Sequence, residues 1–236
     1  MDVVDLRPDL RMLVASPGQA YLLRGADGVT LVDTGPVGSA GAISEALTSW
    51  GAGRSHLRRV IVTHWHHDHT GSLAEIGGWP DVEVLAHRLD APVIRGEAAG
   101  AVPELTAAER ALHAKVALDL PPAPPARVDV ELDDGDVIPG LGARIFWVPG
   151  HTEGSIAVLV PGRGVLFTGD VAAFARGQVI LGPFNADRAR AAQSFRRFGD
   201  VQADAVCFGH GEPLLGEDAQ ALALAGRQPV IPDPLA

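Results

Sequence analysis

Four histidines and one aspartate lie within the six residues from His64 to His69. Imidazole and carboxylate groups are the ligands that zinc and similar divalent ions bind in proteins. The apolar, β-branched run at residues 60–62 directly precedes them and predicts a short buried strand. The ligands would then lie on the loop that leaves this strand, where α/β sheets place their sites. An exposed His-rich stretch is the alternative, but such stretches are low-complexity tails, and this segment lies inside a globular pattern.

Three further residues of the same chemistry occur later in the chain: His151, Asp170 and His210. Each follows an apolar, strand-like run, at residues 145–148, 165–167 and 205–208, and each has a glycine beside it. Glycine lets the backbone turn sharply and approach an ion closely. Four strand ends that each deliver a metal-ligand side chain predict one metal centre.

The order of motifs H-x-H-x-D-H, G-H-T-x-G, T-G-D and G-H-G, over about residues 20–215, resembles the metallo-β-lactamase superfamily. The resemblance implies a four-layer αββα sandwich and two divalent metal ions; zinc is the expected metal, and iron and manganese are the alternatives. It also implies the ligands of each ion. The first ion takes His64, His66 and His151, the second takes Asp68, His69 and His210, and Asp170 bridges the two.

Two residues near these motifs need separate treatment. His67 occupies a variable position of H-x-H-x-D-H and is therefore left outside the ligand set. Asp33 lies in a V-D-T-G turn that the family shares, where it would accept a hydrogen bond from a ligand histidine and fix its ring. A plain turn aspartate is the alternative for Asp33.

Composition narrows the class of protein. The chain has 236 residues, 47% of them hydrophobic, and its ligand motifs must fold into one site, which predicts a single domain over residues 1–236. A net charge of −10 would repel phosphate backbones, so we expect a small-molecule substrate and no nucleic acid. No apolar run approaches the roughly 18 residues of a membrane span, and the start lacks a secretory pattern. We therefore expect a cytoplasmic protein without a membrane partner; the sequence does not indicate its oligomeric state.

Periodicity and turn residues predict a mixed α/β, or α+β, chain. In the first half we expect a hairpin around Gly25 and Gly28, a helix ending near Gly51, a second helix opening at residues 72–76, and strands at residues 59–63 and 82–86. In the second half we expect strands at residues 128–132, 143–148, 155–160 and 165–167, and helices at 187–198 and 218–225. Phe195 and Phe198 should face the core.

Residues 88–126 are predicted to form a helical insertion. Thr106 and Glu109 have the spacing of a capping box, an apolar stripe at residues 105, 112, 116 and 120 follows, and prolines at 121–125 stop the helix. The insertion is either a lid or an outer-layer helix. It and the loop at residues 174–184 are the expected source of substrate specificity. That loop offers Phe174, Ile180 and Phe184 as an apolar wall and Arg176 as an anion anchor, unless the aromatics are core and the arginine is solvated.

A paired-metal site lowers the pKa of a bound water to about 7 and so supplies hydroxide at neutral pH. Asp68 could accept or return a proton beside that water, which makes it the candidate catalytic residue. The expected function is therefore a zinc-dependent hydrolase of a small ester, lactone or thioester. Only 26 residues follow His210, and the sole tyrosine is Tyr21, so typical glyoxalase II-like and lactonase patterns are incomplete. An iron-dependent, sulfur dioxygenase-like oxygenase and a non-catalytic sensor are the alternatives.

Overall fold

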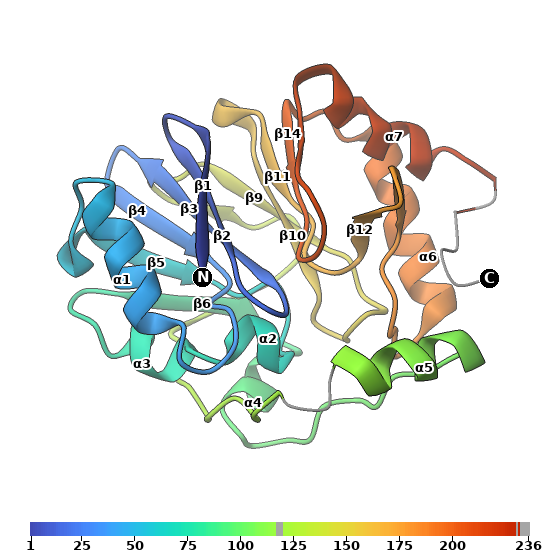
Figure 1. Ribbon diagram of the computed structural model, residues 1–236, viewed down its shortest axis with the longest axis horizontal. Helices are drawn as coiled ribbons and strands as arrows, with labels where there is room; N and C mark the ends of the chain where they lie inside the picture. The colour runs from blue at the N-terminus through green and yellow to red at the C-terminus, as the bar shows by residue number, and fades with distance from the viewer. Residues whose placement is uncertain (117–119, 230, 232–236) are drawn as a thin grey trace. The chain divides into compact units, whose positions relative to one another are not determined.

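A computed structural model describes residues 1–116, 120–229 and 231. The chain divides into two compact units. Unit 1 comprises Met1–Ala99 and Asp119–Leu132, and unit 2 comprises Gly100–Leu118 and Asp133–Ala236. Each unit has one main sheet with helices (Figure 1), which confirms the mixed α/β class. Among the described residues, no helix is long and apolar enough to cross a membrane.

Unit 1 contains a seven-stranded sheet whose strands follow one another in sequence order. The strands are β1 (Asp2–Arg7), β2 (Leu10–Val14), β3 (Gln19–Gly25), β4 (Gly28–Val32), β5 (Leu57–Ile61), β6 (Glu83–His87) and β7 (Val130–Leu132). The first four form an antiparallel meander, and β4 to β7 run parallel. Because parallel strands end at one edge, the loops after β4, β5 and β6 lie together at that edge. The predicted hairpin is confirmed, with Gly25 paired to Gly28.

Unit 1 has the helices α1 (Ala40–Ser49), η1 (Arg54–His56), α2 (His67–Thr70), α3 (Leu73–Gly77) and α4 (Ala91–Ile94). Of these, α1, α3 and α4 contribute buried residues to one apolar cluster with the sheet. Ile43 and Leu47 of α1 are fully buried in one cluster with Leu31 and Val60 of the sheet. Burial of such side chains is the main driving force for holding the helix on the sheet. The predicted helices ending before Gly51 and beginning after Ser72 are confirmed.

Unit 2 contains a six-stranded sheet in the order β15-β14-β11-β10-β9-β8. Its strands are β8 (Val137–Ile138), β9 (Ala143–Trp147), β10 (Ile156–Val160), β11 (Val165–Phe167), β14 (Ala205–Cys207) and β15 (Leu214–Leu215). Only the pair β11 and β14 is parallel among the described strands of this sheet. The loops after these two strands therefore leave the same edge.

Unit 2 has the helices η2 (Pro161–Arg163), α5 (Ala107–Val116), α6 (Arg188–Arg196), η3 (Arg197–Asp200), η4 (Gly216–Ala219) and α7 (Gln220–Gly226). Of these, α6, η3, η4 and α7 contribute buried residues to one apolar cluster with the second sheet. Asp187 caps α6 by accepting a hydrogen bond from the Arg190 amide at 2.9 Å. Phe195 and Phe198 are buried in a cluster with Val206 and Leu222, which confirms the predicted core face of this helix.

Two segments differ from the sequence-based prediction. Residues 174–184 are not a loop, since β12 (Ala172–Ala175) and β13 (Gln178–Leu181) form a hairpin. Arg176 and Gly177 make its turn with φ of 52° and 77°, the positive values that two-residue hairpin turns require.

The predicted helix of the insertion is confirmed as α5, but the residue it buries is Glu109 and not the apolar stripe. Val116 is 42% exposed, and the continuation of the helix lies outside the described residues. Both capping-box bonds are present, from the Thr106 amide to Glu109 Oε2 and from the Glu109 amide to Thr106 Oγ1. The carboxylate is buried with these and other polar partners, whereas Leu105, Leu112 and Leu120 of the stripe are only half-buried.

Candidate metal-binding residues

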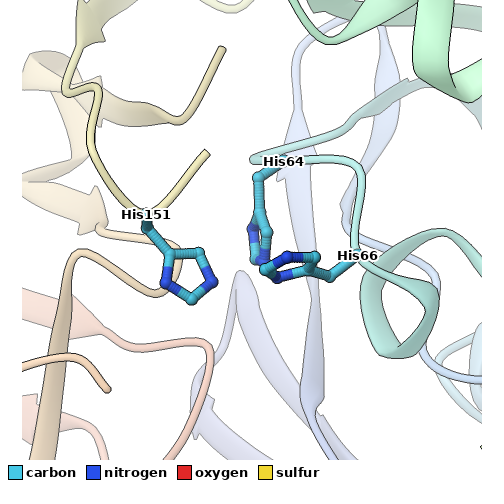
Figure 2. Close-up of side chains that lie close together, drawn as sticks. All are labelled: His64, His66 and His151. Carbon is cyan, nitrogen blue, oxygen red and sulfur yellow. The ribbon is translucent and has the colours of Figure 1, made fainter. Parts of the chain in front are cut away.

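In unit 1, four of the predicted ligands lie on the loop that leaves β5 and on the short helix α2. Figure 2 shows His64 and His66 with their rings close together; the ring centroids are 4.8 Å apart and the planes nearly perpendicular. The His64 and His69 rings are 4.1 Å apart, and both side chains are buried. Asp68 Oδ2 lies 3.5 Å from His69 Nε2. Because a strand end and a single helical turn place these side chains, all four converge within a few residues of chain.

Asp33 is the centre of the hydrogen bonds behind this loop. It follows β4, at the edge where β5 also ends, and it adopts φ of 58°, which is uncommon for a residue other than glycine. Its Oδ1 accepts from the Thr63 amide at 2.8 Å, and its Oδ2 accepts from Thr63 Oγ1 at 2.7 Å. The same Oδ2 lies 2.9 Å from His69 Nδ1. Sparsely populated backbone conformations of this kind concentrate at functional sites.

These contacts fix which ring nitrogen carries the proton in two histidines. A carboxylate only accepts, so His69 must donate from Nδ1, which leaves Nε2 with its lone pair. Thr63 Oγ1 gives its proton to Asp33 and therefore accepts from His64 Nδ1, 3.0 Å away. His64 is then also protonated on Nδ1. Asp33 thus presents the Nε2 lone pairs of two predicted ligands, one for each predicted ion.

The backbone of the loop is fixed by small residues. The amide and Oγ1 of Thr34 both donate to the His69 carbonyl, at 2.7 and 2.8 Å. Thr70 Oγ1 donates to the His66 carbonyl at 3.0 Å. A Cβ at Gly71 would collide with the backbone of Val37, so only glycine allows this close approach. The Thr-Gly pair after His69 is therefore part of what shapes the loop.

Asp90 is a supporting residue that the sequence analysis missed. It is buried, and its Oδ2 accepts from the amide of Trp65, the residue between His64 and His66, at 3.0 Å. Asp90 also occupies the N-cap position of α4, but its side chain makes no capping bond there. Its place just after β6, whose end shares an edge with that of β5, is the feature by which it could have been found.

His67 has a different environment from the four neighbouring ligand candidates. Its Nδ1 accepts a hydrogen bond from the Ala123 amide at 3.1 Å. Ala123 belongs to the proline-rich stretch that returns to unit 1 after the insertion. One ring nitrogen of His67 is therefore engaged with the chain itself.

In unit 2, the three predicted ligands come from three separate loops. His151, labelled in Figure 2, follows β9, Asp170 follows β11, and His210 follows β14. Asp170 Oδ2 lies 3.6 Å from His151 Nε2 and 3.1 Å from His210 Nε2. His151 and Asp170 are buried, whereas His210 is half-exposed. Gly150 has φ of 127°, and a Cβ there would collide with the backbone of Ala191 at the start of α6.

The donor chemistry and spacing within each unit fit a divalent ion. Two tetrahedral ligands that are each about 2.1 Å from one ion lie about 3.4 Å apart. The three nitrogen-to-carboxylate distances, 3.5 Å in unit 1 and 3.1 and 3.6 Å in unit 2, fall around this value. The residues that could hold an ion include all seven predicted ligands: His64, His66, Asp68, His69, His151, Asp170 and His210.

The four residues predicted to line a substrate pocket differ in how far they are buried. Ile180 is buried, and Phe174 is half-buried, stacked 6.4 Å from Phe208 in the core of unit 2. Arg176 is exposed on the turn of the β12–β13 hairpin. Phe184 has φ of 63° and packs edge-on against His113 of α5, with 5.1 Å between ring centroids. Ile180 and Phe174 thus take part in core packing, Phe184 is half-buried against α5, and Arg176 alone of the four is exposed.

Comparison with known proteins identifies the family. The sequence model of the Metallo-beta-lactamase superfamily matches residues 13–210. The chain is 30% identical over 209 residues to a probable metallo-hydrolase, YflN, of Bacillus subtilis, covering 80% of this chain and 77% of that protein. It is 31% identical over 202 residues to a hydroxyacylglutathione hydrolase of Cereibacter sphaeroides, covering 83% of this chain but only 63% of that enzyme.

Solved structures of the same superfamily resemble this chain in fold. TTHA1623, crystallised in a di-iron-bound form, matches with a TM-score of 0.67 and 25% identity over 92% of this chain and 96% of its own. The metallo-beta-lactamase family protein TTHA1429 of Thermus thermophilus shares the fold, with a TM-score of 0.66 and 24% identity over 92% and 78% of the two chains. Given a family match over most of its length and a curated relative at 30% identity, the chain belongs to the metallo-beta-lactamase superfamily.

Proposed function

We propose that this protein is a dinuclear metal-dependent hydrolase that acts on a small ester, lactone or thioester. The observation that carries the proposal is the orientation of His64 and His69 through Asp33, which engages Nδ1 of each ring and directs its Nε2 away from Asp33, in a superfamily whose curated relatives include metallo-hydrolases. Outer hydrogen-bond partners of this kind are a regular part of metal sites.

In this proposal, His64, His66 and His151 would hold one ion, and Asp68, His69 and His210 would hold the other. Asp170 would be a ligand of both. The ions, when bound, would generate hydroxide from water near neutral pH and polarise the substrate carbonyl. Zinc is the proposed metal because it suits a set of imidazoles with two carboxylates.

Asp68 is the proposed catalytic residue. Its side chain is mostly buried, and its Oδ2 lies beside His69 Nε2 at 3.5 Å. A carboxylate in that place can accept a proton from the attacking water and return it to the leaving group. Gly18 packs against the Asp68 backbone, where an added Cβ would lie 3.0 Å from the Asp68 carbonyl oxygen. This contact restricts the backbone position of Asp68, and with it the place from which its carboxylate would accept the proton.

A thioester is the substrate class to test first. The hydroxyacylglutathione hydrolases are thioesterases by their name, and several of them match this chain. The chain spans 63% of the Cereibacter sphaeroides enzyme, so glutathione itself is not part of the proposal. Arg176, on the exposed hairpin turn, is the proposed anchor for an anionic group of the substrate.

An iron-dependent oxygenase is the second candidate, and the di-iron form of TTHA1623 is the observation that favours it. Ligand types alone do not discriminate iron from zinc in such a set.

A cytoplasmic location and the absence of nucleic-acid and membrane partners stay predictions from composition.

The test combines metal analysis with a substrate screen. Protein purified without added metal would be analysed for zinc, iron and manganese, then loaded with each and assayed on thioesters, lactones, phosphodiesters and β-lactams. Hydrolysis by the wild type that is lost in Asp170→Ala supports the proposal. Iron near one per chain, with oxygen consumption and no hydrolysis, would instead establish the oxygenase, and full metal loading without either activity would favour a sensor.

A further inference from the structure

Glu109 is more than a capping residue of α5. A capping box requires one acceptor from the glutamate, which here is Oε2, bonded to the Thr106 amide at 2.8 Å. The other oxygen, Oε1, accepts from the Phe184 amide at 3.3 Å and from Arg188 Nη1 at 3.0 Å. The side chain is almost fully buried. A buried carboxylate with this many partners stabilises one arrangement of the chain around it and is costly to disturb.

One partner of Glu109, Phe184, belongs to a segment that contacts two ligand loops of unit 2, and Arg188 directly follows that segment. We call residues 182–187 the supporting segment. Its Ala186 amide donates to the His151 carbonyl at 3.2 Å, and its Asp187 amide donates to the Gly150 carbonyl at 2.8 Å. At its other end, the Gly182 amide donates to the Val171 carbonyl at 3.1 Å.

Gly182 also lies against a ligand directly, because a Cβ there would collide with the Asp170 carbonyl oxygen. The supporting segment is therefore the common backbone neighbour of His151 and Asp170. Any shift in this segment would move both ligands.

The supporting segment does not hold its shape by local preference alone. Phe184 lies within it at φ of 63°, a conformation that a bulky residue rarely adopts. The strained residue is held from α5, through its amide on Glu109 and its ring against His113. One residue further, the Asn185 carbonyl accepts from the Glu104 amide at 2.9 Å. Strain of this kind persists only where the surroundings impose it, and it concentrates at functional sites.

We propose that Glu109 is a positioning residue for the metal ligands His151 and Asp170, acting through the supporting segment. On this view, α5 is a fixed buttress of the unit 2 ligands and not a lid that opens. The inference rests on the proposed function only in taking these two residues as ligands.

Three variants separate positioning from helix capping. Glu109→Ala removes every bond of the carboxylate. Glu109→Gln retains one acceptor oxygen, but its amide nitrogen must face either the Thr106 or the Phe184 N–H, so it can replace only part of the network. Thr106→Ala is the matched control, because it removes the bond from the Glu109 amide to Thr106 Oγ1 and weakens the start of α5, while Phe184 and Arg188 keep their acceptor.

Two readouts are independent of turnover. Zinc affinity is measured by competition with a chromophoric chelator, and amide hydrogen exchange is measured on the metal-free protein. We expect zinc affinity to fall about tenfold in Glu109→Ala, near the lower end for loss of an outer-sphere support, and by less in Glu109→Gln. Exchange at the Phe184, Ala186 and Asp187 amides should become faster in both variants. Thr106→Ala should keep zinc affinity within about twofold of the wild type, with faster exchange confined to α5.

Two results would overturn the inference. One is Glu109→Ala with unchanged zinc affinity and unchanged exchange at Ala186 and Asp187, which would reduce Glu109 to a capping residue. The other is an equal loss of affinity in Glu109→Ala and Thr106→Ala, which would assign the effect to helix stability. If Glu109→Ala does not fold, the Glu109→Gln comparison decides. A wild type that binds zinc but hydrolyses nothing would defeat the proposed function and leave both readouts intact.

Discussion

The two units support their candidate ligands by different means. In unit 1, four ligands lie between His64 and His69, and buried carboxylates hold the loop through Asp33 and Asp90. In unit 2, each of three ligands has its own loop, and glycines allow those loops to pack tightly against neighbouring backbone. A Cβ at Gly150, Gly182 or Gly211 would collide with Ala191, Asp170 or Phe174, respectively.

This difference predicts how each half responds to mutation. A side-chain acceptor can be removed while the backbone keeps its course, so changes in unit 1 should alter ring orientation and metal affinity first. Close backbone packing tolerates no added atom, so changes at the unit 2 glycines should alter folding first. Asp170 is the exception in unit 2, because it is the side chain that contacts both other ligands there.

Asp170→Ala should have the largest effect on metal binding. It removes the carboxylate next to His151 and His210, and their two imidazoles would then face each other without the charge that offsets the bound ions. We expect metal content and activity to fall together by more than the about 100-fold seen for outer-sphere partners. Circular dichroism should show an intact fold. Full activity in this variant would show that residues 168–170 form a turn and nothing more.

Asp33→Asn should weaken metal binding by about 10- to 100-fold. Asparagine tolerates the positive φ of this position, so the backbone is preserved. It offers one acceptor oxygen in place of two, so it leaves either the Thr63 amide or His69 Nδ1 facing an NH₂ donor. Metal affinity by chelator competition is the measurement. Unchanged affinity would mean that Asp33 is a plain turn aspartate and would remove the contrast between the two units.

Asp90→Ala tests the second carboxylate of unit 1 and should have a smaller effect. The Trp65 amide loses its acceptor, which costs about 1 kcal/mol of folding free energy, and more if water cannot replace the bond. No ring nitrogen is involved, so metal affinity should fall by only a few-fold. Urea unfolding and chelator competition on the same preparation give both numbers. A loss as large as that of Asp33→Asn would show that backbone placement, and not ring orientation, dominates in unit 1.

The sequence predicted the hairpin, most helices and the strands that precede ligands, because their apolar runs are bounded by glycine or by a capping residue. It missed β1 and β2, since residues 2–14 mix charges with apolar residues and have no glycine turn to separate them. It also took residues 174–184 for a loop, although Arg176-Gly177 is a two-residue turn between short β-forming runs. Short strands of this kind depend on partners that only the fold supplies.

In the candidate site, too, features set by local sequence could be predicted, and features set by distant contacts could not. Clustered ligands with glycine beside them could be read from the chain, whereas the contact of Asp90 with the Trp65 amide and that of Glu109 with the Phe184 amide could not. Both act on an amide distant in sequence, 25 residues away for Asp90 and 75 for Glu109. Sequence patterns report local structural preferences, and a polar contact between residues far apart in the chain produces no such pattern.

His67→Ala should leave metal content unchanged, and so should His113→Ala. His67 accepts a hydrogen bond from the Ala123 amide, so the substitution should lower the free energy of unfolding by about 1 kcal/mol. It would also remove one contact that holds the proline-rich stretch after the insertion. The ring of His113 packs against Phe184, which is not a predicted ligand. Elemental analysis of both variants beside the wild type is the check. A fall in metal stoichiometry in His67→Ala would add a fifth ligand to unit 1.

The smallest effect should come from a carboxylate remote from the ligand loops. Asp27, in the β3–β4 turn at the opposite end of β4 from Asp33, pairs with Arg59 of β5, and this bond lowers the pKa of Asp27 below its usual value. A lowered carboxyl pKa contributes stability above the unfolded pKa of about 3.9, and that contribution is lost as pH falls through the lower folded pKa. Because Asp27 is partly exposed, the contribution should stay below about 1 kcal/mol. Asp27→Asn should therefore flatten the stability profile below pH 4 by that amount in urea titrations, with zinc affinity at pH 7 unchanged. A loss of zinc affinity in this variant would mean that unit 1 transmits a change along β4 to Asp33, and the ligand loop would then depend on the whole sheet and not only on its carboxylates.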